Sequence, residues 1–209
     1  MKIGIIGAGF VGRAIAKLAI VAGHQVMLSN SRNPQTLFSL KPMIGCETGT
    51  ASEAARFGEV VVIAVPLTAI GALPVAELQG KPLLDAVNYY PDRDGLVEAL
   101  DRNQTTTSEL LAHTLSSSRV TKAFNAIPMT QLESDGLPEG AADRRALPVA
   151  GDDPQGKRIA SELYSAFGFD VVDVGPLAEG WRFERGRPAY CVRMTKDALT
   201  ASLAQTQRT

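Results

Sequence analysis

The feature that most constrains the fold lies in residues 2–12, where an apolar run breaks into a glycine-rich turn. The run Lys2–Ile6 is followed by Gly7, Gly9 and Gly12 in a Gly-x-Gly-x-x-Gly pattern. Between a buried strand and a helix, the first glycine allows the bend, the second lets a pyrophosphate approach, and the third lets helix and strand pack closely. The free N–H groups at the helix start favour phosphates. Glycines are also common in ordinary turns, but this context predicts a dinucleotide site formed by Gly7, Ala8, Gly9, Phe10, Val11 and Gly12.

The segment after the turn has the pattern that such a site requires. Val11, Ile15, Leu18 and Ala22 share one face of a predicted helix, and Arg13 and Lys17 point elsewhere. Gly23 is expected to end this helix, and residues 25–28 form the next predicted strand. The result is the strand–turn–helix–strand unit of a mononucleotide-binding half.

The residues after this second strand favour NADP(H) over NAD(H). Sites that select NAD usually place a carboxylate about 20 residues beyond the glycines, but this chain has Asn30, Ser31 and Arg32 there and no carboxylate between Met1 and Glu47. The guanidinium of Arg32 can hold a 2′-phosphate, and Ser31 can donate a hydroxyl hydrogen bond. The alternative is that Arg32 is a solvated loop residue.

Composition limits the classes of protein to which the chain can belong. Its 209 residues, 45% of them hydrophobic, suffice for one sizeable core, and a net charge of −1 argues against a nucleic-acid surface. No run is apolar enough for a membrane span, and the apolar N-terminus is expected to be structure rather than a signal peptide. Cys46 and Cys191 are expected to be reduced thiols in a cytoplasmic protein, although a disulfide between them stays open.

Strand and helix patterns alternate along the first 174 residues. Helices are predicted at 34–40, from the Thr50 cap through Ala55, at 108–115, and from Pro154 behind the Asp153 cap. Strands are predicted at 2–6, 25–28, 59–65, 81–87, 119–124, 145–150 and 170–174. This alternation predicts an α/β fold with a Rossmann-like, doubly wound and mostly parallel sheet. We therefore expect an NADP-binding domain over residues 1–174. A short, loop-rich C-terminal extension over residues 175–209 would pack on the same domain or on a partner subunit.

The carboxyl ends of the predicted strands carry polar, Gly or Pro residues. In such sheets ligands bind beyond these ends, so the segments should meet in one cleft, although each could be an ordinary loop. The segment 181–185 could cover this cleft or contact a second subunit; a surface loop that packs one aromatic side chain inward is equally compatible. The five strand-end segments are Gly7–Gly12, Ser29–Arg32, Val65–Pro66, Asn88–Tyr90 and Asn125–Pro128.

Few residues are suited to acid–base or metal chemistry. His24 and His113 are expected to be structural, and no nucleophile constellation or metal-ligand spacing is present. Reduction of a carbonyl usually needs a proton donor, whereas reduction of a flavin-like ring depends on it less. A cofactor that carries the chemistry fits this inventory. Ala126 and Ile127 would form a platform for the hydride acceptor, with Asn125 as an orienting amide.

At this point the motifs resemble a known family. The chain is similar to the coenzyme F420-dependent NADP oxidoreductases, and also to the NADP-binding domains of iron-reducing metalloreductases. The resemblance covers nearly the whole chain. It rests on Gly7–Gly12, Ser31-Arg32, Ala64-Val65-Pro66, Lys122–Pro128, Ala150–Asp153, Gly168-Phe169 and Gly175-Pro176-Leu177.

The resemblance implies roles for several of these residues. Ser31 and Arg32 would hold the 2′-phosphate, while Ala64, Val65 and Pro66 would line the dinucleotide. The segment Asn125–Pro128 would border the nicotinamide and the acceptor. Asn125 departs from the deazaflavin enzymes, which tend to have histidine there, and the metalloreductase domains are closer at this position. The family is usually oligomeric, so a homodimer is expected.

Three functions therefore stay open. The first is an oxidoreductase that transfers hydride between NADPH and a small redox substrate, which is a deazaflavin such as coenzyme F420, a flavin or a related ring. The second is a non-catalytic NADP(H) sensor. The third is a reductase of a small imine or carbonyl compound, against which the short C-terminal region argues.

Overall fold

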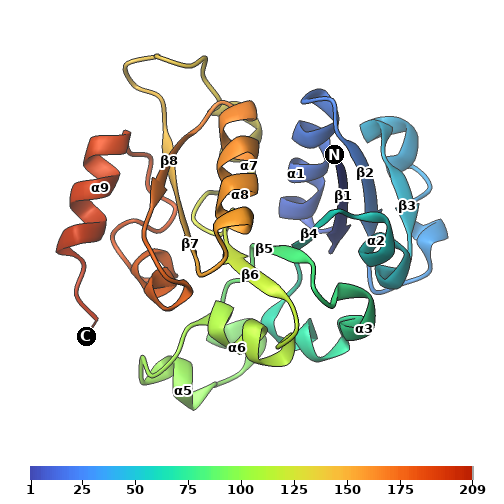
Figure 1. The fold of residues 1–209 in the computed structure, drawn as a ribbon, viewed down its shortest axis with the longest axis horizontal. Helices are drawn as coiled ribbons and strands as arrows, with labels where there is room; N and C mark the ends of the chain where they lie inside the picture. The colour runs from blue at the N-terminus through green and yellow to red at the C-terminus, as the bar shows by residue number, and fades with distance from the viewer. Residues whose placement is uncertain (209) are drawn as a thin grey trace.

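The computed structural model describes residues 1–208 and contains one central sheet with helices on both faces (Figure 1). The strands lie in the order β3-β2-β1-β4-β5-β6-β7-β8, and every neighbouring pair is parallel except β6 and β7. This arrangement confirms the predicted Rossmann-like α/β fold. The strands are β1 Lys2–Ile6, β2 Gln25–Ser29, β3 Glu47–Gly49, β4 Val60–Ile63, β5 Pro82–Asp85, β6 Arg119–Lys122, β7 Ala146–Gly151 and β8 Asp170–Asp173.

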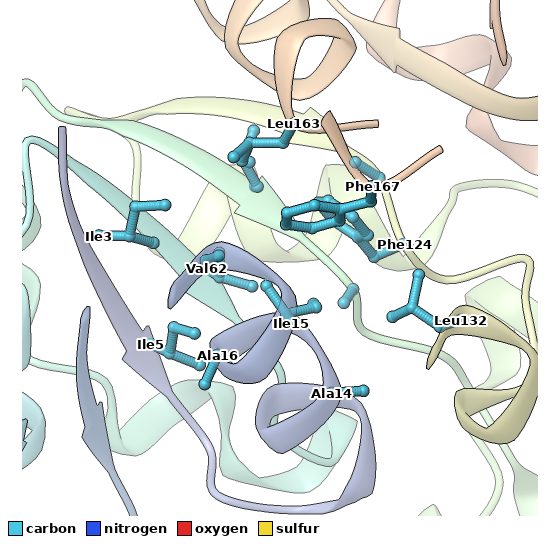
Figure 2. Packing of buried hydrophobic residues seen from close by; sticks show 14 of the residues in the cluster. Ile3, Ile5, Ala14, Ile15, Ala16, Val62, Phe124, Leu132, Leu163 and Phe167 are labelled. Carbon is cyan, nitrogen blue, oxygen red and sulfur yellow. The ribbon is translucent and has the colours of Figure 1, made fainter. Parts of the chain in front are cut away.

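The helices bury the two faces of the sheet in separate apolar clusters. On one face Ile3, Ile5 and Val62 pack with Ile15 of α1 and Leu163 of α8 (Figure 2). The opposite cluster includes α2, α3 and α6. The helices are α1 Phe10–Val21, α2 Ala51–Phe57, α3 Val75–Leu78, α4 Pro91–Asp94, α5 Glu98–Asp101, α6 Thr107–Thr114, α7 Met129–Ser134, α8 Pro154–Ala166 and α9 Lys196–Gln205.

Strand β4 explains why the central sequence is continuously apolar. Val60 and Val62 enter the α1 cluster, whereas Val61 and Ile63 enter the cluster with α2. A strand that is covered on both faces needs apolar side chains at every position. The strand is shorter than predicted because the chain leaves the sheet after Ile63. Strands β5 and β6 likewise end two residues before the predicted boundaries, at Asp85 and Lys122. The residues that were predicted to end these strands lie in the loops that follow them.

Several short elements were missed by the sequence analysis. Strand β3 has three residues, and α3, α4 and α5 have four each. Elements of this length do not span enough positions to show a helical or alternating period. Helix α7 follows Pro128 and was also not predicted.

The prediction that the C-terminal extension is loop-rich is wrong for its last part. Residues 196–205 form α9, whose Leu199 and Leu203 are buried in a third apolar cluster with Phe183. These two leucines, four residues apart, are enough to dock one face of the helix on β7 and β8 at the edge of the sheet (Figure 1). A 3₁₀ helix at Leu177–Phe183 also buries Trp181 and Phe183. The domain boundary at residue 174 stays a prediction.

None of the helices described within residues 1–208 combines the length and the apolar character that are needed to cross a bilayer.

Gly4 tests how closely α2 packs on β1. A Cβ atom at this position would lie 2.1 Å from the carbonyl oxygen of Ala54, so Gly4→Ala must push the helix away. We expect it to lower the free energy of unfolding by about 1–3 kcal/mol, the usual cost of overpacking. The matched control is Gly71→Ala, where a Cβ meets nothing within 4 Å. Urea denaturation should show a lower midpoint for the first variant alone; equal midpoints would contradict the packing argument.

Candidate functional site

A cavity of about 370 Å³ opens at the carboxyl ends of β1, β2 and β4. It brings together nine residues predicted to bind a dinucleotide: Gly7, Ala8, Gly9, Asn30, Ser31, Arg32, Ala64, Val65 and Pro66. Three of the predicted strand-end segments therefore meet in one place. The sequence analysis did not assign the remaining lining residues to this site: Ile6, Arg13, Ala51, Ala69, Ala72 and Leu73.

The three glycines of the turn have different physical roles. Gly7 has a φ of +116°, and a Cβ there would lie 2.2 Å from the carbonyl oxygen of Ala64. A Cβ on Gly12 would lie 1.9 Å from the carbonyl oxygen of Gly7. Gly9 instead faces open space, with nothing within 4 Å of its Cβ position. Gly7 and Gly12 are therefore required by the packing of the protein itself, whereas Gly9 leaves room for a ligand.

Helix α1 begins at this open space with Phe10 and Val11. No side chain caps its N-terminus, and its first turn contains no acidic residue. The first N–H groups of a helix lack partners within the helix and carry partial positive charge. The start of α1 is therefore suited to bind an anion in the cavity.

The loop after β2 is shaped by Asn30. Its side-chain oxygen accepts a hydrogen bond from the Arg32 N–H at 3.0 Å, and its Nδ2 donates to Thr36 Oγ1 at 2.9 Å. The side chains of Ser31 and Arg32 make no hydrogen bond or ion pair within residues 1–208, and no Asp or Glu lines the cavity. Both side chains are thus available to an anion.

The predicted acceptor residues Asn125 and Ile127 lie outside this cavity, at the ends of β5 and β6, and so do Asn88 and Ala126, which were predicted to bind the cofactor. Asn88 Nδ2 donates to the carbonyl oxygen of Asn125 at 3.0 Å, and Asn125 Nδ2 donates to the carbonyl oxygen of Phe183 at 3.0 Å. Asn125 Oδ1 is buried and has no partner among the described residues. Ala126 and Ile127 are 4% exposed and pack in two different clusters. Their role as a platform stays a prediction.

A buried network of charges below these strand ends was missed by the sequence analysis. Lys122 is fully buried, and its Nζ lies 3.3 Å from Glu184 Oε1 and 3.8 Å from Asp85 Oδ2. It also donates to Thr107 Oγ1 at 2.8 Å and to Ser108 Oγ at 3.1 Å. The only sequence signal was a lysine within a predicted strand, next to the apolar Ala123 and Phe124; its acidic partners lie far away along the chain.

The pKa values of the two carboxyl groups in this network shift in opposite directions. Burial raises the pKa of Asp85, and the ammonium of Lys122 and the Ser108 hydroxyl offset this only in part. Burial also acts to raise the pKa of Glu184, but Lys122 and Thr107 outweigh it and hold this pKa below its ordinary value. Lys122 pairs with Glu184, which also accepts hydrogen bonds from Thr107, and these contacts join the C-terminal extension to β6 and to the start of α6.

A pair of tyrosines lies beside Asn88. The hydroxyl oxygens of Tyr90 and Tyr190 are 2.5 Å apart, and burial raises the pKa of Tyr190. The guanidinium groups of Arg93 and Arg185 lie 4.8 Å and 5.2 Å from the centre of the Tyr90 ring. Arg93 also donates to the carbonyl oxygen of Asn88 at 2.8 Å. The two tyrosine hydroxyls are candidate proton donors near the end of β5, and the sequence analysis did not identify them.

The segment 181–185 contacts the predicted acceptor region from several sides. Phe183 binds Asn125, Glu184 binds Lys122, and Arg185 stacks on Tyr90. Trp181 and Phe183 are themselves buried. The segment is therefore packed over the ends of β5 and β6 rather than lying loosely on the surface. Cys46 and Cys191 are both free thiols, so the structure contains no disulfide between them.

Comparison with known sequences gives matches to redox proteins. The sequence model of the family described as NADP oxidoreductase, coenzyme F420-dependent, matches residues 2–89. Metalloreductase STEAP3 of Rattus norvegicus is 32% identical over 185 residues, which cover 88% of this chain and 36% of that protein. The protein YjhV of Escherichia coli (strain K12) is 40% identical over 60 residues, 29% of this chain and 44% of that protein. The chain thus spans less than half the length of these curated relatives.

Solved structures extend the likeness over most of the chain. A hypothetical protein from Sinorhizobium meliloti has a TM-score of 0.81 and 28% identity, covering 94% of this chain and 96% of that one. A candidate F420-dependent NADP-reductase from Arthrobacter sp. FB24 has a TM-score of 0.72 and 26% identity, covering 84% and 85%. A pyrroline-5-carboxylate reductase from Coxiella burnetii, at 19% identity and a TM-score of 0.59, shares the fold. Together with the family match, these findings confirm the resemblance predicted from the sequence motifs.

The Lys122–Glu184 pair predicts a pH-dependent contribution to stability. Because the pKa of Glu184 is lowered in the folded state, its contribution is full above the ordinary value of 4.5 and is lost as the pH falls through the folded-state pKa. We expect Glu184→Gln to lower the free energy of unfolding by about 2 kcal/mol at pH 7, the cost of a lost charged hydrogen-bond partner. The difference should shrink below pH 4.5.

A neighbouring ion pair gives the control for this experiment. Glu179 pairs with Arg182 at 2.6 Å in the same 3₁₀ segment, but both side chains are partly exposed. Glu179→Gln should cost less than about 1 kcal/mol. Urea denaturation of both variants across this pH range measures the difference. Equal losses, or a loss for Glu184→Gln that does not change with pH, would contradict the assigned network.

Proposed function

We propose that this chain, whose residues 2–89 belong to the coenzyme F420-dependent NADP oxidoreductase family, binds NADP(H) and transfers a hydride between it and a ring-shaped acceptor. The cavity at the ends of β1, β2 and β4 carries the proposal. It combines an uncapped helix start, an open approach at Gly9, and arginines without a carboxylate. These features fit a dinucleotide whose adenosine ribose is phosphorylated.

Each feature would hold one part of the dinucleotide. The N–H groups at the start of α1 would bind the pyrophosphate, which passes Gly9 where no protein atom interferes. Ser31 and Arg32 would hold the 2′-phosphate, because their side chains have no other partner within residues 1–208. A carboxylate in this position would repel that phosphate, and none lines the cavity.

The acceptor would bind at the ends of β5 and β6. Bound NADPH supplies the hydride, so the residues of the protein need only orient the rings and exclude water. Asn125 is suited to orient an amide because its Oδ1 has no partner, while its Nδ2 is fixed by Phe183. Ala126 and Ile127 would supply the apolar surroundings. We propose a deazaflavin or a flavin as this acceptor.

The tyrosine pair supports a second candidate function. Reduction of an imine or a carbonyl needs a proton donor near the hydride path. The Tyr90 and Tyr190 hydroxyls contact each other, and Arg93, which stacks on the Tyr90 ring, donates to the carbonyl oxygen of Asn88. A small imine or carbonyl compound is therefore the alternative substrate. In either case we propose that the chain acts as a homodimer, as the family resemblance implies, and in the cytoplasm, as its two free cysteines suggest.

Arg32 tests the assigned cofactor. Arg32→Glu replaces the proposed 2′-phosphate partner with a repelling carboxylate, so NADPH binding should weaken by about 1–3 kcal/mol, the range for a lost charged hydrogen bond. The affinity for NADH should change much less. Arg158→Glu is the control, since Arg158 is an exposed arginine on α8 that makes only a 3.9 Å pair with Glu162. Calorimetric titration measures these affinities; an unchanged NADPH affinity for Arg32→Glu would mean that the phosphate binds elsewhere.

The acceptor can be identified by following the absorbance of NADPH. We expect NADPH to be oxidised when a deazaflavin or riboflavin phosphate is the acceptor. With a ferric chelate or a cyclic imine as the acceptor, NADPH oxidation should not be faster than with these ring acceptors. Asn125→Ala should lower kcat more than it weakens NADPH binding, because the amide acts at the acceptor end. Turnover of the imine alone, and its loss in Tyr190→Phe, would favour the alternative substrate. Tight NADPH binding without turnover of any acceptor would favour a sensor.

A further inference from the structure

Arg13 is a second arginine of the cavity that the proposed function does not use. It lies on the first turns of α1, and its side chain lines the same cavity as Asn30 and Arg32. Its Nε donates a hydrogen bond to the carbonyl oxygen of Ala8 at 2.7 Å. Side chains on a helix lean toward its N-terminus. This bond therefore holds the guanidinium beside the glycine turn and leaves its terminal nitrogens available.

The charge of Arg13 is not neutralised by the protein. Its only hydrogen bond is to a neutral carbonyl oxygen, and it forms no ion pair within residues 1–208. Lys17, four residues along the same helix, shows the contrast: its Nζ lies 2.6 Å from Glu133 Oε2. Since the cavity contains no carboxylate, Arg13 and Arg32 place two unneutralised positive charges on one small volume.

Two guanidinium groups on one cavity match an anion with two charges. The pyrophosphate of a dinucleotide carries one charge on each phosphorus, and the start of α1 already offers N–H groups for it. A phosphate monoester instead carries close to two charges at neutral pH and has three acceptor oxygens, enough for two arginine forks.

We propose that Arg13 and Arg32 together clamp the 2′-phosphate of the cofactor, so that Arg13 sets the preference for NADP(H) over NAD(H). This inference rests on the proposed function and deepens it. Arg32 approaches the phosphate from the loop after β2 and Arg13 from α1, with Asn30 holding the loop between them. Arg13 is a binding residue for the 2′-phosphate and has no part in hydride transfer.

The experiment compares ligands that differ only in this phosphate. Arg13→Gln removes the charge and keeps a polar side chain, although a shorter one. Calorimetry with NADPH and NADH, and with adenosine 2′,5′-bisphosphate and adenosine 5′-monophosphate, isolates the contribution of the 2′-phosphate. We expect the affinity of the variant to fall roughly tenfold or more for the two ligands that carry a 2′-phosphate, NADPH and adenosine 2′,5′-bisphosphate. The affinities for NADH and the monophosphate should change less than about twofold. Arg13→Lys should lose less than Arg13→Gln, because it keeps the charge but not the fork.

Lys17→Gln gives the matched control, because it removes one positive charge from the same helix outside the cavity. It should leave all four affinities unchanged. The pH supplies a second readout: the 2′-phosphate takes up a proton near pH 6, so NADPH affinity should fall as the pH drops through this value. The fall should be smaller in Arg13→Gln.

The outcomes separate this inference from the proposed function. Equal losses for NADPH and NADH would assign Arg13 to the pyrophosphate and overturn the inference. Unchanged affinities in Arg13→Gln, with its thermal unfolding as in the unsubstituted protein, would show a surface arginine and overturn it as well. Both results leave NADP(H) binding itself intact. A protein that binds neither dinucleotide would instead refute the proposed function, and the inference with it.

Discussion

The contact on which the rest of the structure depends is the backbone approach between the glycine turn and its surroundings. Gly7 lies so close to Ala64, and Gly12 so close to Gly7, that neither position has room for a Cβ atom. This packing aligns β1, β4 and the start of α1 in one tight corner. The helix begins directly at this corner, after Gly9, which lines the cavity, and no side chain caps its first N–H groups. The proposed anion site would therefore follow from how the first strand and helix pack.

The other half of the site depends on a different kind of interaction. Lys122 carries a charge into a fully buried position, which is costly unless the charge is paired and hydrogen-bonded. Glu184 and the hydroxyls of α6 meet this requirement. The C-terminal extension is thereby held over the ends of β5 and β6, where Phe183 also fixes the Asn125 amide. The same contacts that satisfy the lysine shape the proposed acceptor region.

The sequence could predict those parts of the site whose causes are local. The glycine turn, the capped helices, the apolar run of β4 and the loop with Ser31 and Arg32 follow from neighbouring residues, and the structure places them as expected. Contacts between distant segments could not be found in this way. Glu184 meets Lys122, and Tyr190 meets Tyr90, only after the chain has folded. Helical periodicity correctly placed Arg13 outside the apolar face of α1. Periodicity alone does not show that the side chain of Arg13 lines the same cavity as Arg32.

The uneven placement of charge links binding to stability. Across the described surface many arginines and lysines have acidic partners, as in Arg56–Glu77 and Lys41–Glu47. The cavity is different, because Arg13 and Arg32 both line it and no carboxylate does. Their mutual repulsion is a small cost in the free protein, screened by solvent and salt. A doubly charged phosphate would convert that repulsion into attraction. Since a ligand that binds only the folded state stabilises it, the two arginines proposed to select the phosphorylated cofactor would also let that cofactor stabilise the fold.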